Sequence, residues 1–185
     1  MAGALGLEQI EPFGSFDGVP LGFANRVRRG PIGVVGASGT GLQAVTSYIH
    51  ALGSGISHAI GTGSHDLSDA VGGITTLMGL EALEGDPDTR LIAIISKPAG
   101  SETLGRVVER IQACPKPVVA ALHGAVVGAG AVIASACDIR VASERAKFAV
   151  NHVRIAGVSI DGGYFFLNRV LGMAKTMELV LTRRF

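Results

Sequence analysis

The chain has 185 residues, of which 48% are hydrophobic and 17% charged, so it can bury the core of one ordinary domain and is not disordered. Its 16 Lys and Arg nearly balance 15 Asp and Glu, without a basic face interleaved with aromatic residues, which excludes nucleic acid as a partner. Cys114 and Cys137 are too few for a disulfide scaffold and lie in apolar helical patterns. We therefore expect no metal site and a reduced, cytoplasmic location.

The apolar stretches also argue against a membrane protein. The N-terminus has no basic region and reaches Glu8 and Glu11 before any long apolar run, so we expect no signal peptide. Pro117–Cys137 is as long as a membrane span, but it is rich in Ala and Gly, begins with proline and contains His123. We interpret it as a buried strand followed by a helix, and we expect no membrane association.

Strands and helices alternate along most of the chain. Residues 1–30 are Gly-rich with several turn signals, and we predict an irregular N-terminal segment there. Short apolar runs then predict strands, and stripes at helical spacing predict helices between them. The predicted strands are Ile32–Val35, Ile56–Ile60, Leu91–Ile95, Val118–Leu122 and Ile139–Ala142. The helical stripes are Leu42, Val45, Ile49 and Leu52; Val71, Ile74, Leu77 and Leu80; and Leu104, Val107, Val108 and Ile111, the last helix with Ser101 as its N-cap.

Continuous apolar strands that alternate with helices are typical of parallel sheets buried on both faces. The predicted fold class is therefore α/β, a layered, mostly parallel sheet with helices on both faces. A glycine-rich segment, Gly128–Cys137, supplies the helix that follows the fourth strand.

The loop GASGTG at residues 36–41 lies between a strand and a helix, where free N–H groups and the helix dipole attract an anion. No Lys-Ser/Thr pair follows, so it is not a Walker A loop, and the acidic residue of a dinucleotide site is missing. The residues alone leave two interpretations open, an anion site or close packing of the helix on the strand.

The phrases RRGPIGVVGASGTGLQAV, GGITTLMGLEAL and DPDTRLIAIISKP resemble the flavodoxin-like second domain of the succinyl-CoA synthetase alpha-subunit family, in particular its FdrA-type branch. The resemblance covers residues 18–114. It implies that Ser38, Gly39 and Thr40 face an anion such as an acyl phosphate or phosphohistidine. His58 and His65 lie beside glycine turns, without a base or ligand spacing around them, and we interpret them as ordinary loop or strand-end residues.

The phrases KPVVAALHGAVVGAGAVIASACDIRVAS and GVSIDGGYFFLNRVLGMAKTMELVLT resemble the crotonase, or enoyl-CoA hydratase/isomerase, superfamily over residues 115–185. The resemblance implies an oxyanion hole, in which two backbone N–H groups hold a thioester oxygen. One donor matches Ala129, between Gly128 and Gly130. The other belongs to an upstream segment, and the stretch at residues 63–67 resembles it only faintly.

The catalytic carboxylates of the hydratases are missing from the matching positions, which hold Val132 and His152. Asp161, in SIDGG, matches the aspartate that some isomerases use for proton transfer, so we identify it as the candidate catalytic residue. The alternative is that Asp161 caps the helix beginning near Tyr164. Crotonases continue beyond the position of Phe185 into a helical lid and trimerisation region, so we expect a homo-oligomer.

We divide the chain into the irregular segment 1–30, a synthetase-like part 31–116 and a crotonase-like part 117–185, which we expect to share one sheet. Three functions remain open. The first is a crotonase-type protein associated with a CoA thioester, with at most residual isomerase-like proton transfer. The second is a non-catalytic subunit or anion-binding module, and the third is a recombined product without function. The expected ligand is an acyl-CoA or acyl phosphate, with no covalently bound cofactor.

Overall fold

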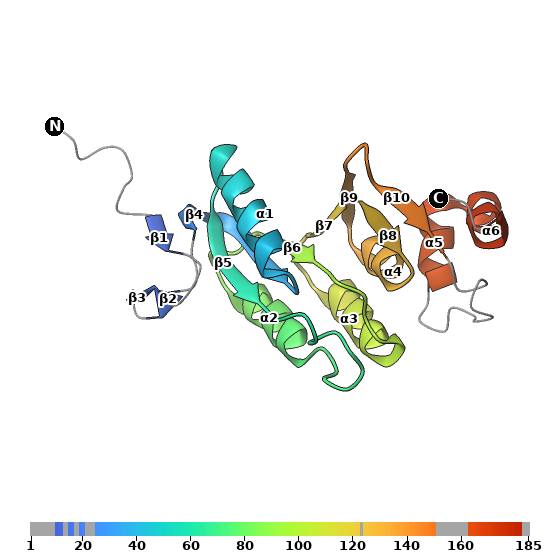
Figure 1. The fold of residues 1–185 in the computed structure, drawn as a ribbon, viewed down its shortest axis with the longest axis horizontal. Coiled ribbons are helices and arrows are strands. Elements are labelled where there is room, and N and C mark those ends of the chain that lie inside the picture. The colour runs from blue at the N-terminus through green and yellow to red at the C-terminus, as the bar shows by residue number, and fades with distance from the viewer. Residues whose placement is uncertain are drawn as a thin grey trace.

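The computed structural model describes residues 10–12, 15–16, 19–20, 25–122, 124–150 and 163–182. Its strands are β1 (Ile10–Pro12), β2 (Ser15–Phe16), β3 (Val19–Pro20), β4 (Arg26–Gly36), β5 (Ile56–Gly61), β6 (Leu91–Ile95), β7 (Val118–Leu122), β8 (Ala125–Val127), β9 (Ile139–Ala142) and β10 (Lys147–Ala149). Its helices are α1 (Gly39–Ala51), α2 (Ile74–Gly85), α3 (Ser101–Ala113), α4 (Ala129–Ala136), α5 (Gly163–Leu171) and α6 (Met173–Thr182). Figure 1 shows their order from the N-terminus to the helices α5 and α6 at the opposite end of the molecule.

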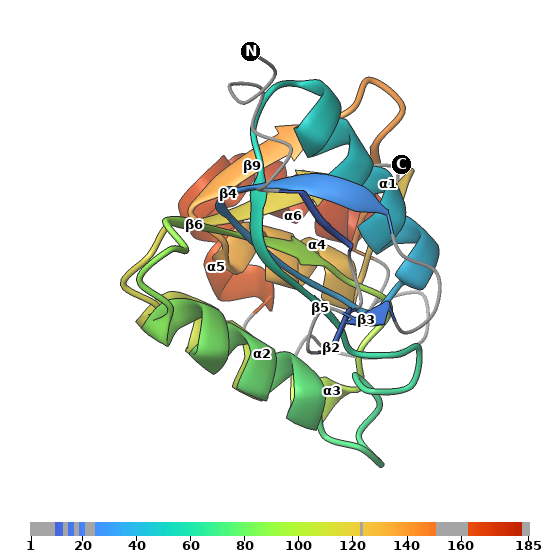
Figure 2. The same ribbon diagram turned by 90° about the vertical axis from the view of Figure 1, so that its left-hand side faces the viewer.

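One mostly parallel sheet organises the molecule. Strands β5, β4, β6, β7 and β9 are hydrogen-bonded in that order and all run parallel, and β1 pairs antiparallel with the start of β4. The strands β8 and β10 form a separate parallel pair. Helices cover both faces of the main sheet, with α1 on one side and the neighbouring α2 and α3 on the other (Figure 2). The predicted fold class is confirmed.

The alternation of side chains along the strands explains the two layers of core. Val34 belongs to the smaller cluster under α1, with Leu42 and Ile56, whereas its neighbour Val35 belongs to the larger cluster under α2, α3 and α4. Successive residues of a strand point to opposite faces, so an apolar run such as β4 or β6 fills both layers. Around β4 and β6 the sheet is therefore buried on both sides, whereas Ile139 and Val141 on the edge strand β9 are exposed.

Three sequence expectations need correction. The segment 1–30 is not irregular throughout, because β1, β2, β3 and the start of β4 lie in it. Ser101 is the first residue of α3 rather than its N-cap, which is Gly100. Leu52, expected on the buried stripe of α1, is the C-cap and is largely exposed.

The predicted stripe of α2 is also displaced. Its buried residues are Thr76, Gly79, Leu80 and Leu83. Leu80 was predicted to be buried and is buried. Val71 and Ile74 were also predicted to be buried but are exposed, and Val71 precedes the helix. The helix is apolar on nearly all sides, so its periodicity does not single out one face.

Candidate functional site

The carboxyl ends of three parallel strands are held together by backbone hydrogen bonds. The N–H of Ala37 donates to the carbonyl of Ile95 at 2.9 Å, and the N–H of Thr62 donates to the carbonyl of Gly36 at 3.0 Å. The order β5-β4-β6-β7-β9 reverses between β4 and β6. In open α/β sheets, ligands bind outside the carboxyl ends of the strands at such a reversal point. The predicted glycine loop at residues 36–41 lies there.

The first turn of α1 presents two free backbone donors. Ser38 is the N-cap, and its hydroxyl accepts a hydrogen bond from the N–H of Gly41 at 3.2 Å. Within the described part of the chain, the N–H groups of Gly39 and Thr40 have no acceptor. A side chain at Gly39 would meet no atom within 4 Å, so this end of the helix is open. It has the positive dipole end that attracts an anion.

The first turn of α2 is already occupied by a carboxylate. Asp66, in the loop after β5, accepts hydrogen bonds from the N–H of Thr75 at 2.9 Å, the N–H of Thr76 at 3.0 Å and the Thr76 hydroxyl at 2.6 Å. Burial raises the pKa of the Asp66 carboxyl, but these hydrogen bonds outweigh burial and leave the pKa below its usual value. A negative charge is therefore built into the start of this helix.

The first turn of α3 is occupied in the same way by Asp69 of the same loop. Its carboxylate accepts from the N–H of Thr103 at 3.0 Å, and this hydrogen bond lowers the pKa of Asp69. A side chain at Gly100 would lie 2.3 Å from the Asp69 carboxyl carbon, which explains the glycine at the N-cap. Of the three helices that follow β4, β5 and β6, only α1 thus lacks an internal carboxylate at its start.

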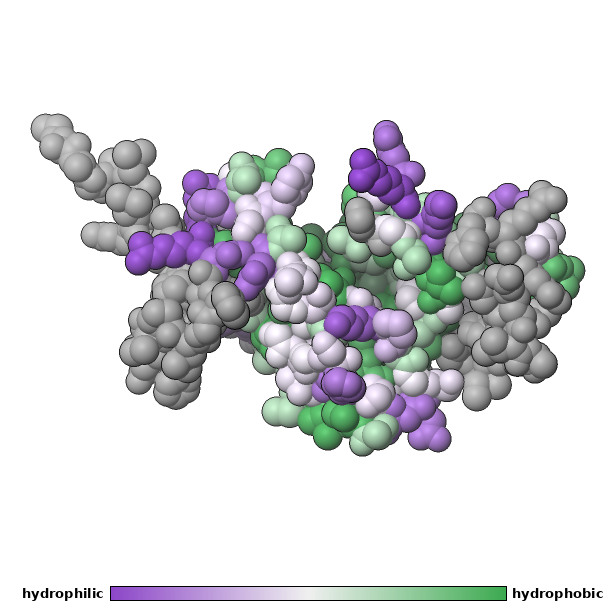
Figure 3. All heavy atoms as spheres, in the orientation of Figure 1, coloured by the Kyte–Doolittle hydropathy of each residue, from purple (hydrophilic) through white to green (hydrophobic). Residues whose placement is uncertain are grey.

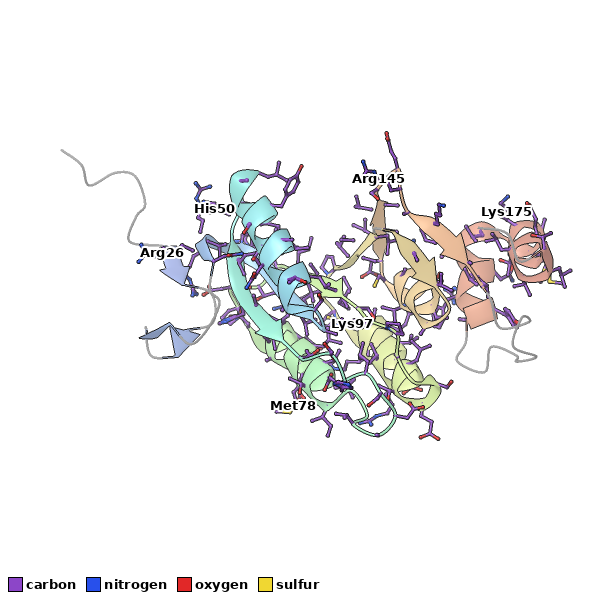
Figure 4. All side chains as sticks on the ribbon, viewed as in Figure 1. Arg26, His50, Met78, Lys97, Arg145 and Lys175 are labelled. Atoms are coloured by element: carbon purple, nitrogen blue, oxygen red, sulfur yellow. The ribbon has the colours of Figure 1, made fainter. Side chains whose placement is uncertain are left out.

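A lysine lies at the same edge of the sheet. Lys97 follows the end of β6, and its Nζ donates to the hydroxyl of Ser64 in the loop after β5, at 2.9 Å (Figure 4). No local pattern in the sequence marks Lys97, because the residue that positions it, Ser64, is 33 residues away along the chain.

The second glycine stretch forms the start of α4. Gly128 has φ +54°, a conformation that favours glycine, and its carbonyl accepts from the N–H groups of Ala131 at 2.9 Å and Val132 at 3.2 Å. The N–H of Gly128 donates to Ala149 at 3.2 Å. The N–H groups of Ala129 and Gly130 have no acceptor among the described residues. This arrangement offers two donors to a carbonyl oxygen.

A cavity of about 110 Å³ lies beside this turn. Small or apolar side chains from the ends of β6 and β7 and from α4 form most of its wall, which includes Ser96, Ala120, Leu122, Gly130, Ile133 and Cys137. Burial raises the pKa of the Cys137 thiol to about 12, so that thiol stays protonated at neutral pH. Ser96 and Ile133 also line a hollow of about 10 Å³ at Gly36, so the two glycine turns are neighbours at one edge.

Of the positions that the sequence comparison singled out for catalysis, the structure describes Val132. Val132 is 1% exposed and packs in the large core cluster. His123, His152 and Asp161 lie outside the described residues, and α5 begins at Gly163. The role of Asp161 as catalyst or helix cap stays a prediction.

The remaining candidates do not assemble into a metal or nucleophile site. His58 lies on β5, 3.6 Å from the carboxylate of Asp86, which follows the far end of α2. His65 is exposed in the loop that carries Asp66. No group of three His, Cys, Asp or Glu side chains that could hold a metal occurs in the described ranges. None of the described helices is long and apolar enough to cross a membrane.

Two family models match the chain. The model of the CoA binding domain matches residues 27–121, and that of enoyl-CoA hydratase/isomerase matches residues 93–184. The first therefore covers the loop at 36–41 and the second covers the turn at Gly128. Both include residues 93–121, which contain α3 and most of β6 and β7.

Individual relatives divide in the same way. The chain is 52% identical over 103 residues to "Uncharacterized protein YahF" of Escherichia coli, which covers 56% of this chain and 20% of that protein. It is 36% identical over 99 residues to a probable enoyl-CoA hydratase of Bacillus subtilis, which covers 54% of this chain and 35% of that protein. The chain thus spans between about a fifth and about a third of the length of these relatives.

Solved structures show the crotonase likeness in three dimensions. An enoyl-CoA hydratase from Polaromonas sp. JS666 is 28% identical with a TM-score of 0.54, over 62% of this chain and 52% of that chain. An enoyl-CoA hydratase/isomerase family protein from Hyphomonas neptunium is 26% identical with a TM-score of 0.54, over 58% of this chain and 50% of that chain. The chain belongs to the CoA binding domain family through residues 27–121, and its residues 93–184 are similar to the enoyl-CoA hydratase/isomerase family.

Proposed function

We propose that the chain binds a CoA thioester at the carboxyl edge of its sheet, with the acyl carbonyl held at the first turn of α4. The observation that carries this proposal is the pair of N–H groups of Ala129 and Gly130, which lack acceptors among the described residues and lie beside an apolar cavity of about 110 Å³. Two fixed donors next to an apolar pocket suit a thioester, whose oxygen is polar and whose acyl chain is not.

The chemistry that this site could support is a proton shift. The oxyanion donors would stabilise the charge that develops on the thioester oxygen when a carbon-bound proton is removed. The carboxylate of Asp161 would take that proton and return it to another carbon of the acyl group, so that no atom is gained or lost. Hydration is not proposed, because Val132 and His152 stand where hydratases of the superfamily have glutamates.

The start of α1 supports a second candidate function, that of an anion-binding module. The N–H groups of Gly39 and Thr40 are open there, whereas Asp66 and Asp69 already occupy the starts of α2 and α3. A phosphate or acyl phosphate would therefore be directed to α1. This site and the α4 turn lie on the same edge, so one CoA thioester with its phosphates could use both.

The deciding experiment is a thermal-shift titration with acetyl-CoA, CoA and inorganic phosphate. A ligand that binds only the folded chain raises its stability, by about 2.7 kcal/mol at a concentration 100 times its Kd. Acetyl-CoA should stabilise more than CoA if the α4 turn holds the carbonyl. Stabilisation by phosphate alone would favour the anion-binding module, and no shift with any ligand would favour a product without function.

The variant Ala129→Pro sharpens this test. Proline at the first position of a helix is tolerated but has no N–H, so one proposed oxyanion donor is lost while α4 persists. We expect about fivefold weaker acetyl-CoA binding, since a net hydrogen bond contributes about 1 kcal/mol, and unchanged binding of CoA. Met173→Pro is the matched control, because Met173 also opens a helix after a glycine with positive φ. Equal losses in both variants would argue against the proposed role of Ala129.

A further inference from the structure

We propose that the groove between α2 and α3 is the contact surface of a homodimer, in which α2 of one copy packs over α3 of the other. The groove has a volume of about 530 Å³ and runs along the outer side of the two helices. Its walls include Ile74, Met78 and Glu81 from α2 and Arg106, Glu109 and Arg110 from α3. This inference is independent of the proposed CoA site.

The apolar residues of α2 are the first observation. Ile74 is 55% exposed and Met78 is 64% exposed, one turn apart on the same wall of the groove. Hydrophobic atoms gather at the lower margin of the molecule in Figure 3, where Figure 4 labels Met78 pointing outward. A helix that is apolar on nearly all sides is normally covered on all sides. The sheet covers only the face that carries Leu80 and Leu83.

The charges in the groove identify the occupant. Glu81 and Glu109 form no ion pair with any described residue, and the Arg106 guanidinium donates only to the carbonyl of Gly72, at 3.1 Å. Arg110 is already paired with Glu84. The lining thus carries both signs in near balance, which gives no attraction to nucleic acid, an anionic membrane or an acidic peptide. A second copy offers the same mixed set and can match it.

A two-fold axis parallel to the helices brings the opposite charges of the two copies together. It places α2 of one copy opposite α3 of the other, so that Glu81 faces Arg106 twice, once on each side of the axis. The apolar wall with Ile74 and Met78 then lies against the stem of Arg106 on α3 of the other copy. Glu81 and Arg106 of each copy thereby gain an ion-pair partner in the other copy.

The size of the face predicts a reversible dimer. The helices have 12 and 13 residues. They are each about 18–20 Å long and packed about 8–10 Å apart, so the face covers roughly 400 Å² in projection. Two such faces bury roughly 800 Å² in total, which is below the usual range of stable interfaces and suits a weak dimer that dissociates on dilution.

A second exposed apolar surface, on α5 and α6, has charged side chains that already contact groups of the same surface. Its Lys175 and Glu178 pair with each other at 2.9 Å, and the Arg169 guanidinium lies over the Phe165 ring at 5.2 Å. Met173 on α6 is 62% exposed, nearly the same as Met78. It therefore offers a matched control position for a substitution in the groove.

The first experiment is sedimentation velocity over a range of concentrations. We expect a monomer–dimer equilibrium for the native chain, a dissociation constant at least tenfold higher for Met78→Glu, and no change for Met173→Glu. A native chain that is monomeric at every concentration would overturn the proposal. So would the reverse pattern, in which Met173→Glu dissociates the dimer and Met78→Glu does not.

The second experiment tests the pairing itself. Glu81→Arg and Arg106→Glu each place like charges opposite one another in a dimer of identical copies, so each variant alone should dissociate at least tenfold more readily. In an equimolar mixture, the two variants should restore a dimer containing one copy of each, because opposite charges then face each other on both sides. A contact within one chain cannot produce this recovery. A mixture that remains as dissociated as the separate variants would exclude the proposed arrangement.

Discussion

Asp66 belongs to the loop after β5, yet its carboxylate completes the first turn of α2. The three hydrogen bonds that it accepts keep its pKa below the usual value despite burial. A carboxylate with a lowered pKa in the folded state stabilises the fold above its pKa in the unfolded chain, which is about 3.9. That stability is lost as the pH falls through the lower pKa of the folded state.

We therefore expect Asp66→Asn to lower the free energy of unfolding by about 1–2 kcal/mol at neutral pH, because the helix loses a charged cap. The difference in stability between the two chains should shrink below pH ~4, where Asp66 of the unsubstituted chain becomes protonated in the unfolded state. Urea titrations across this pH range measure both effects. Glu144→Gln, in the exposed turn between β9 and β10, is the control and should leave the curve nearly unchanged.

Val132 is the residue that most restricts the chemistry of the crotonase-like part. It has no titratable atom, and each missing proton transfer costs about 10²–10⁴-fold in rate. We expect no measurable hydration of crotonyl-CoA. The assay measures the decrease in enoyl-thioester absorbance that hydration would cause. Replacing Val132 with Glu should not restore hydration but should destabilise the fold, since this position is 1% exposed and packs in the core. Rapid hydration by the native chain would show that the site is elsewhere.

Any remaining activity should depend on Asp161. Asp161→Asn removes the only carboxylate that the superfamily resemblance assigns to proton transfer, so deuterium exchange into the acyl chain of a bound acyl-CoA should stop. Mass spectrometry of the recovered acyl-CoA measures this exchange. Exchange that continues unchanged in the variant would favour the alternative, a helix cap without a catalytic role.

At the scale of elements, the sequence predicted the central strands and missed the non-local features. The bounds of β6, β7 and β9 agree with prediction. The first two are continuous apolar runs, and β9 is a short β-branched segment between Asp138 and Ser143. The strands before residue 30 were missed, since β1 depends on its pairing with β4. The cap of α3 was missed because Asp69 reaches Thr103 across 34 residues, and local patterns do not encode such contacts.

The cap of α3 makes a testable pair of residues. Gly100→Ala should push the Asp69 carboxylate away from the helix, because the new side chain would lie 2.3 Å from its carboxyl carbon. Gly100→Ala and Asp69→Ala should therefore lower the midpoint of urea unfolding by similar amounts. The double variant should be as stable as the less stable of the two single variants, since both changes remove the same interaction. Additive losses would mean that Gly100 is required for another reason.

The candidate site was also only partly visible in the sequence. The two glycine turns could be located because each lies between an apolar strand and a helical stripe. That they are neighbours depends on Ser96 and Ile133, which come from different segments and meet only in the folded chain. The start of α1 stands out only because carboxylates occupy the starts of α2 and α3, and those contacts are likewise seen only in the folded chain.

At the scale of the whole molecule, the two family matches overlap in the middle of one sheet. Residues 93–121 are common to both matches, and β7 pairs with β6 on one side and β9 on the other. Backbone hydrogen bonds of a parallel ladder do not depend on side-chain identity, so a strand can border sequences of different origin. We therefore propose that the parts 31–116 and 117–185 differ in sequence origin but unfold together.

Limited proteolysis tests this proposal. If the parts form one body, no preferred cut should occur between Ile111 and His123, because no linker rich in Gly, Ser or charges separates them. Mass spectrometry of early digestion products should instead show cuts nearer the ends of the chain. Two stable fragments that meet near residue 116 would show that the parts are independent domains.

The loop at residues 62–73 has a consequence for motion, because it ties two helices at once through Asp66 and Asp69. Its backbone also accepts the N–H of Gly100 at Leu67, 2.8 Å away. If this loop opens, α2 and α3 lose their first turns together and should behave as one cooperative unit. Native-state hydrogen exchange should then give the first-turn amides of both helices the same opening free energy, and Asp66→Asn should speed exchange in α3 although Asp66 does not cap it.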